Sequence, residues 1–191
     1  MTVSRPGGRS ARVRAAVRDA TLAELTDKGY AGLTVEGVAA RSGVHKTTVY
    51  RRWGGVDDLL ADALDQTRET PWPVPDTGTV EGDLVAVAVE IASAFGDAGV
   101  PTAVVAASFQ SPRAALALQA FYAARQEEAA KVVVRAVDRG ELPGGVDPVE
   151  VVRLACAPLY YRVFITREPV DAVVAERAAH AAIAAARAGV V

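Results

Sequence analysis

The residues best suited to chemistry lie in one short stretch, positions 45–52, where nearly every side chain can donate a hydrogen bond. The lysine near its start can reach guanine acceptors, and the two threonines can hydrogen-bond a base or place a methyl group against thymine. The two arginines at its end would add salt-dependent affinity for phosphate groups. The stretch therefore predicts a surface that reads double-stranded DNA. Its candidate contacts are His45, Lys46, Thr47, Thr48, Tyr50, Arg51 and Arg52.

Residues 34–50 have the form of a helix-turn-helix, which is the scaffold that such donors require. Thr34 is a suitable N-cap for the first helix, whose free N–H groups would attract a phosphate, so it joins the candidate DNA contacts. Gly43 permits the turn, and Tyr50 is also placed for a phosphate. The apolar positions that must face inward are Val35, Val38, Ala39, Val44 and Val49. The alternative is a structural helical hairpin with a basic exterior.

Helical periodicity dominates the whole chain. No segment shows the alternation of apolar and polar residues, bounded by turn residues, that is typical of a β-hairpin. We therefore predict an all-α protein. Gly29 should end the first helix, Asp147 should cap a helix that begins at Pro148, and Pro158 should kink that helix. The helices are expected at about 9–28, 34–41, 45–53, from Asp57 onward, 80–97, 101–110, 112–139, 148–166 and 170–187.

Three prolines within residues 71–79 favour extended backbone and mark the boundary between two parts of the chain. Residues 1–53 carry ten Lys and Arg against four Asp and Glu, whereas the remainder carries 11 against 19. This asymmetry predicts a polyanionic partner for the N-terminal part, and the alternative is a solvated basic tail. The parts that we expect are a flexible lead at 1–8, a helix-turn-helix domain at 9–53, a connecting helix at 54–70 and a helical domain at 80–191.

Composition excludes several classes of protein. The single cysteine, Cys156, cannot form an intramolecular disulfide, and two histidines cannot complete a zinc site with it unless several carboxylates join them. We expect neither a metal nor a cofactor. No uncharged stretch reaches the roughly 20 apolar residues that span a bilayer, and the basic start lacks the apolar region of a signal peptide. We therefore expect a cytoplasmic protein with no membrane partner.

Residues 9–65 resemble the DNA-binding domain of the TetR family of bacterial transcriptional regulators, chiefly in the segment KGYAGLTVEGVAARSGVHKTTVYRRW. The resemblance implies about nine helices, of which the first three bind DNA and the others form a ligand-binding and dimerisation domain, here residues 80–191. Members often carry a Ser or Thr and a phosphate-binding Lys where the fourth helix begins. Gly55, Val56 and Asp57 occupy that place, so we expect no phosphate contact there.

The predicted helices at 148–166 and 170–187 carry more apolar surface than one core contact would cover. The first is apolar around more than half of its circumference, and the second repeats small residues at spacings of four, three and four. We expect both to form a four-helix bundle with a second copy of the chain about a two-fold axis. Ordinary core packing is the alternative. The candidate interface residues are Val152, Leu159, Val163, Val174, Ala178, Ala181 and Ala185.

A ligand-responsive regulator needs a cavity among its middle helices, and aromatic and polar residues are the available markers. For each aromatic residue the alternative is ordinary core packing. The many Ala and Val residues could leave room for a small apolar effector. The candidates for an apolar wall with polar anchors are Trp72, Phe95, Phe109, Gln119, Phe121, Tyr122 and Arg125.

Together these features favour a homodimeric repressor of a palindromic operator that releases DNA when a small apolar molecule binds. A DNA-binding regulator without a ligand, or one that activates transcription, would share every DNA feature. An all-α enzyme with His45 or His180 as a base is a remote alternative, because no recognisable nucleophile turn or phosphate loop accompanies them. We expect His180 to form a surface pair with Glu176 on the same helix.

Overall fold

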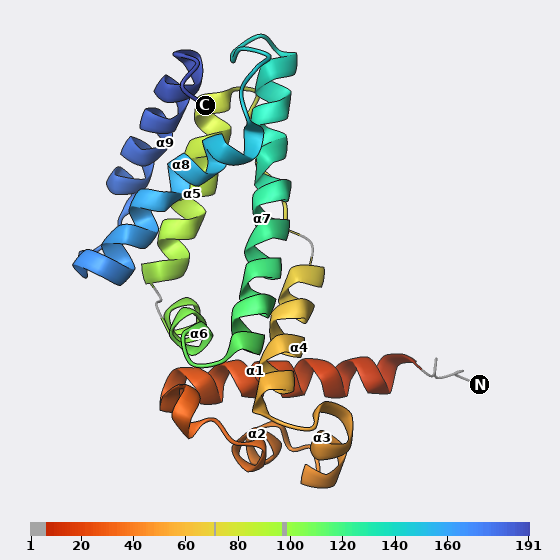
Figure 1. The fold of residues 1–191 in the computed structure, drawn as a ribbon. Helices are drawn as coiled ribbons and strands as arrows, with labels where there is room; N and C mark the ends of the chain where they lie inside the picture. Colours follow the sequence, from red (N-terminus) through yellow and green to blue (C-terminus); the bar gives the residue numbers. More distant parts are fainter. Residues whose placement is uncertain (1–6, 71, 97–98) are drawn as a thin grey trace. The chain divides into compact units, whose positions relative to one another are not determined.

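The structure is a computed structural model that describes residues 7–70, 72–96 and 99–191 (Figure 1). Over these residues the chain forms nine α-helices and one π-helical turn and contains no strand, which confirms the predicted all-α fold. The elements are α1 (Gly7–Gly32), α2 (Val35–Ser42), α3 (Lys46–Trp53), α4 (Val56–Glu69), α5 (Val80–Gly96), α6 (Val100–Ser108), α7 (Pro112–Asp138), α8 (Pro148–Tyr161), η1 (Arg162–Thr166) and α9 (Ala172–Arg187).

The helix boundaries follow the local signals in the sequence. Gly29 has a positive φ of 69° and breaks α1 three residues before its end, so the predicted stop is confirmed. The Asp147 carboxylate caps α8 by accepting hydrogen bonds from the backbone N–H groups of Val149 and Glu150, at 2.9 and 3.1 Å. At the start of the chain, α1 includes Gly7 and Gly8, which we had assigned to the flexible lead. Residues 1–6 of that lead, Pro71 and Asp97 lie outside the described part of the chain.

The helix predicted at 148–166 is not one regular α-helix. It changes at Tyr161 into the π-helical turn η1, and Arg167 ends that turn with a left-handed φ of 58°. Pro158 lies inside α8 and lacks the N–H that would bond to the carbonyl of Leu154. The chain thus adopts the wider π spacing within one turn after the proline, at a place where we expected a kink.

The chain divides into two compact units. The first contains residues 7–70 and 99–121, and the second contains residues 72–96 and 122–191. Helix α7 contributes its first ten residues to the first unit and the rest to the second. The stretch 99–121 therefore groups with the DNA-binding helices, whereas we had placed it in a C-terminal domain at 80–191.

The core of the first unit is built on α1, which packs against α2, α4 and α6. Leu25 of α1 and the adjacent Leu59 and Leu60 of α4 are almost completely buried. Each fully buried leucine contributes about 1.5–3 kcal/mol relative to an exposed one. The long α1 therefore supports α2 directly, whereas α3 packs against α2 and α4.

The core of the second unit is formed by α5, α8 and α9 together with the C-terminal part of α7. Leu84, Val132 and Leu159 are fully buried in it, and small residues of α9 such as Ala179 allow close approach. Within the described part of the chain, none of the helices has by itself the length and the apolar composition needed to span a bilayer. Helices α5 and α6 have the necessary length and apolar composition only when they are taken together.

Candidate nucleic-acid interface

Helices α2 and α3 are joined by a tight turn that fixes their crossing. The Thr34 hydroxyl accepts a hydrogen bond from the backbone N–H of Gly37 at 3.0 Å, as expected for an N-cap. Gly43 has φ 67° and ψ 12°, a left-handed conformation that favours glycine. Val38 and Val49 are fully buried between the two helices. The predicted helix-turn-helix is therefore present with its caps, its turn and its inward face.

Helix α3 is anchored to the first unit through Trp53, the last residue of the helix. Its ring is buried, and its indole N–H donates to a carboxylate oxygen of Asp62 on α4 at 2.8 Å. Arg14 of α1 binds the other oxygen of that carboxylate at 2.6 Å. Burial alone would raise the pKa of Asp62, but hydrogen bonds from Arg14, Trp53 and Gln66 outweigh it and lower that pKa. One carboxylate thus ties α1, α3 and α4 together.

Helix α2 is anchored through Glu24, a nearly fully buried residue of α1. Lys28 and Arg41 bind its two carboxylate oxygens at 2.6 and 2.8 Å. Hydrogen bonds from Lys28 and then Arg41 lower the pKa of Glu24 against the effect of burial. A Cβ on Gly37 would lie 2.4 Å from a Glu24 carboxylate oxygen, so any larger residue would force a shift where α2 crosses α1.

The outer face of α3 presents the predicted donors. The side chains of the first three residues, His45 to Thr47, are exposed, and Thr48 is half-buried. His45 acts as the N-cap, because its Nδ1 accepts from the backbone N–H of Thr47 at 3.4 Å. Tyr50, Arg51 and Arg52 are exposed on later turns. A shallow hollow of about 410 Å³ lies beside this face and is lined by Glu36, Ala39, Ala40, Gly43, Val44, His45 and Lys46.

Two of the predicted phosphate contacts already have partners within the protein. The Tyr50 hydroxyl donates to a Glu36 carboxylate oxygen at 3.0 Å, and this bond raises the pKa of Tyr50. The Arg52 guanidinium donates to the Ser10 hydroxyl at 3.2 Å and lies over the Trp53 ring, 5.0 Å from its centroid. Sequence reasoning missed both partners. Ser10 is 42 residues from Arg52, so no local pattern signals that contact.

The candidate ligand residues are divided between the two units. Trp72, Phe95, Tyr122 and Arg125 belong to the second unit, and Phe109, Gln119 and Phe121 belong to the first. The Trp72 indole N–H donates to Glu90 at 2.6 Å, and the Arg125 guanidinium lies 5.7 Å from the centre of the Trp72 ring. The Phe109 side chain is 86% exposed, and the Gln119 side chain is also exposed.

An aromatic cluster in the second unit brings two of these residues together with two that were missed. The Tyr160 ring meets Phe95 and Tyr122 edge to face, with ring centres 5.0 and 5.6 Å apart. Phe164 adds a second edge-to-face contact to Phe95 at 5.6 Å. Burial raises the pKa of both tyrosines, so each keeps its hydroxyl proton. Tyr160 and Phe164 lie in the helix predicted at 148–166 and were not among the candidate ligand residues.

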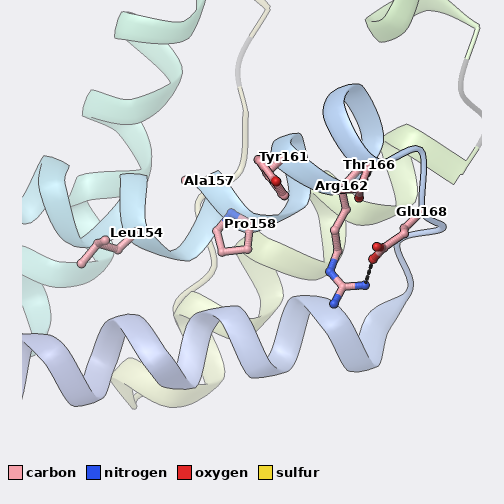
Figure 2. Close-up of a pocket in the computed structure, with 7 residues that line it drawn as sticks. All are labelled: Leu154, Ala157, Pro158, Tyr161, Arg162, Thr166 and Glu168. Atoms are coloured by element: carbon pink, nitrogen blue, oxygen red, sulfur yellow. Dashed lines mark hydrogen bonds and ion pairs between the residues drawn. The ribbon is translucent and has the colours of Figure 1, made fainter.

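The candidate interface residues of α8, η1 and α9 differ in burial. Val152, Leu159 and Ala178 are buried in the core of the second unit, so their side chains are not available to a partner. Val163, Val174 and Ala185 are half-buried, and Ala181 is exposed. The outer face of α8 instead carries a hollow of about 430 Å³ around Pro158 (Figure 2). Its lining residues are Leu154, Ala157, Pro158, Tyr161, Arg162, Thr166 and Glu168, with Arg162 paired to Glu168 at 2.6 Å.

The histidines considered as catalytic bases occupy ordinary positions. His180 on α9 pairs with Glu81 of α5 at 3.0 Å, so the expected pairing with Glu176 is not formed. Both partners are exposed at the surface of the second unit. His45 caps α3 as described above.

Comparison with known proteins relates both parts of the chain to one family. Residues 17–63 match the model for "Bacterial regulatory proteins, tetR family", and residues 74–182 match that for "Tetracyclin repressor-like, C-terminal domain". The HTH-type transcriptional regulator AqdR of Rhodococcus erythropolis is 34% identical over 142 residues, which cover 73% of this chain and 68% of that protein.

Two solved structures show the same fold. The TetR family transcription regulator SCO0332 is 29% identical with a TM-score of 0.70, and the match covers 90% of this chain and 97% of that one. A complex of SmeT with triclosan is 18% identical with a TM-score of 0.64, and the match covers 91% and 90% of the two chains.

Proposed function

Because the chain belongs to the TetR family of bacterial regulatory proteins, we propose that it is a homodimeric repressor whose affinity for a palindromic operator falls when a small apolar molecule binds. Its role as a DNA-binding transcriptional regulator follows from the family. The sign of regulation, the dimer and the effector are the parts that we propose. We expect it to act in the cytoplasm, where its DNA target would lie.

The observation that carries the proposal is the presentation of α3. Val49 and Trp53 fix one side of this helix in the core, while Lys46, Thr47 and Thr48 remain accessible at its start. A recognition helix enters the major groove with these first residues toward the base edges. We propose that Lys46 and the two threonines read bases, and that Thr34, His45, Tyr50, Arg51 and Arg52 position the helix on the DNA backbone.

A dimer would present two copies of the recognition helix α3 to the same DNA. Leu154, Tyr161 and Ile165 leave large apolar areas exposed along α8 and η1, beside the half-buried Val163. Burying such a face against a second copy would remove apolar area from water, and Ala181 of α9 would allow close packing there. Two recognition helices about 34 Å apart would then read two half-sites one turn apart.

The proposed effector site lies at the aromatic cluster of the second unit. Phe95, Tyr122 and Tyr160 supply apolar ring faces and two protonated hydroxyls, which suits a small, largely apolar molecule with a polar group. SmeT, which shares the fold, forms a complex with triclosan. A ligand that binds more tightly to the conformation with low operator affinity would weaken operator binding. The size of the effect is set by the difference between the ligand's affinities for the two conformations.

The test is DNA binding by the full-length protein. Duplexes are selected from a random-sequence library, and the recovered sequence is titrated against an unrelated duplex at several salt concentrations. We expect one palindromic sequence bound by two protomers, with a specificity ratio of about a thousandfold or more over the unrelated duplex. Equal and weak binding to both duplexes would contradict the proposal.

Matched variants locate the recognition surface. Lys46→Ala with Thr48→Ala should reduce the preference for the selected sequence by about 1–3 kcal/mol for each lost base contact. Arg68→Ala, which removes a cation paired with Asp65 on α4, should leave that preference unchanged. If both variants behave alike, α3 does not read the sequence.

Thermal unfolding separates a ligand-responsive regulator from one without a ligand. A library of small apolar phenols and related molecules is screened for an increase in melting temperature, and each hit is added to the DNA-binding assay. We expect at least one hit to weaken operator binding in the native protein and to lose its effect when Tyr160→Phe is combined with Phe95→Ala. A hit that strengthens operator binding would favour an activator or a corepressed regulator.

A further inference from the structure

The lysines and arginines that the structure describes in the first unit fall into two groups. In the first group each cation is paired with a carboxylate; these residues are Arg14, Arg18, Lys28, Arg41, Arg68 and Arg113. In the second group no ion pair forms with any residue that the structure describes; these residues are Arg9, Arg12, Lys46, Arg51 and Arg52. A cation without an acidic partner keeps its full charge for an external anion.

The unpaired cations are confined to two places, the start of α1 and the length of α3. These two places are in contact, because the Arg52 guanidinium donates to the Ser10 hydroxyl at 3.2 Å. Figure 1 shows the N-terminal part of α1 passing next to α3 within the first unit. The side chains of Arg9 and Arg12 are exposed, so the positive surface of α3 continues onto the start of α1.

We propose that Arg9 and Arg12 form a second phosphate-binding surface, which contacts the DNA backbone flanking the bases read by α3. This inference rests on the proposed function and extends its contact surface beyond the helix-turn-helix. The Arg12 Nε donates a hydrogen bond to the carbonyl of Gly8 at 3.2 Å, and this neutral acceptor does not compensate the guanidinium charge. The duplex backbone is the matching partner, because it presents a regular row of negative charges.

Backbone contacts of this kind have a defined signature. Each phosphate that a cation neutralises adds about 0.9 to the slope of log affinity against log salt, and it does so for any base sequence. Two such cations per protomer would add about 2 to 4 to the slope for a dimer. The effect requires DNA outside the half-sites, so it should disappear when the duplex ends at the outer edge of the recognised bases.

The experiment uses the full-length protein and the selected duplex in two lengths. The short duplex ends at the half-sites, and the long duplex carries about ten further base pairs on each side, a length of about one helical turn. The native protein should bind the long duplex more tightly and with the steeper salt slope. Arg9→Gln with Arg12→Gln should lower affinity for the long duplex about tenfold, reduce its salt slope by about 2 to 4, and leave short-duplex binding nearly unchanged.

The matched control removes two cations that already have acidic partners. Arg18→Gln with Arg68→Gln changes the net charge of the first unit by the same amount, and these residues pair with Asp19 and Asp65. This control should retain the preference of the native protein for the long duplex. Circular dichroism of all variants checks that α1 is still formed.

The outcomes separate this inference from the function on which it rests. If both double variants lose affinity equally, or if the native protein binds the two duplexes alike, the second surface is overturned while sequence recognition by α3 stands. If selection recovers no preferred sequence, both the proposed regulator function and the proposed second phosphate-binding surface are contradicted.

Discussion

The Ser111 hydroxyl donates a hydrogen bond to a carboxylate oxygen of Asp57 at 2.8 Å and so joins the start of α7 to the first turn of α4. Tyr30, near the end of α1, donates to the same oxygen. These two hydrogen bonds, first from Tyr30 and then from Ser111, lower the pKa of Asp57. Where the family pattern often has a phosphate-binding lysine, this chain therefore has an internal acceptor that connects three helices of the first unit.

Replacing Ser111 with alanine should weaken this connection and the start of α7 together. The Ser111 hydroxyl also accepts from the backbone N–H of Ala114 at 3.1 Å, so the variant loses a cap as well as a bond to a carboxylate. We expect a loss of about 1–3 kcal/mol in the free energy of unfolding, measured in urea at fixed protein concentration. The Ser108 hydroxyl donates to the carbonyl of Val105 in its own helix. Ser108→Ala should therefore change the free energy of unfolding by no more than about 0.5 kcal/mol.

Asp62→Asn should lower stability in a pH-dependent way. The pKa of Asp62 is lower in the folded chain, because its hydrogen bonds from Arg14 and other donors outweigh burial. Its contribution is therefore fully present above the unfolded pKa of about 3.9, and it is lost as the pH falls through the lower folded value. The difference between native and variant proteins in urea unfolding should be about 1–3 kcal/mol at pH 7 and should shrink below about pH 4. A difference that grows on acidification would contradict this assignment.

Gly37→Ala tests the close crossing of α1 and α2. The added Cβ would lie 2.4 Å from a Glu24 carboxylate oxygen and 3.1 Å from the Thr34 hydroxyl, so either the buried carboxylate or the cap must shift. We expect a net loss of about 1–3 kcal/mol, despite the gain of about 1 kcal/mol that alanine gives over glycine in a helix. Gly144→Ala, at a position with nothing within 4 Å, is the control. Equal stability of the two variants would mean that α2 can move away from α1.

The features that could be predicted from sequence are those fixed by three or four adjacent residues. The cap at Thr34, the turn at Gly43 and the stop at Gly29 depend on local backbone geometry, and each lies where its residue type indicated. The all-α class and the helix-turn-helix follow from periodicity in the same way. The DNA-facing side of α3 could be inferred because Val49 and Trp53 identify its buried side.

The features that could not be predicted depend on residues far apart in the chain or on helix phase. The bond between Ser111 and Asp57 spans 54 residues, and no short pattern encodes it. Helix α8 is apolar around most of its circumference, so its sequence does not show that Val152 faces the core while Leu154 faces outward. The π-helical turn after Pro158 was missed for a related reason, since a proline removes a hydrogen bond without specifying how the backbone responds.

The bond between Tyr50 and Glu36 leads to a prediction about DNA affinity. Tyr50 has one hydroxyl proton, and it is donated to the Glu36 carboxylate at 3.0 Å, so Tyr50 must release this partner before it can donate to a phosphate. The Glu36 charge also lies on the face that would approach DNA. Glu36→Gln should therefore tighten operator binding about two- to tenfold and steepen its salt dependence. Fluorescence anisotropy with the selected duplex measures both quantities.

Two further variants distinguish release of Tyr50 from a simple change in net charge. Asp65→Asn removes one negative charge from α4, where Arg68 is its partner, and should change affinity less than Glu36→Gln does. Tyr50→Phe removes the hydroxyl. In that background, Glu36→Gln should increase operator affinity only by the amount due to the lost negative charge. If Glu36→Gln has the same effect with and without the Tyr50 hydroxyl, the two residues act independently and Glu36 opposes DNA binding through its charge alone.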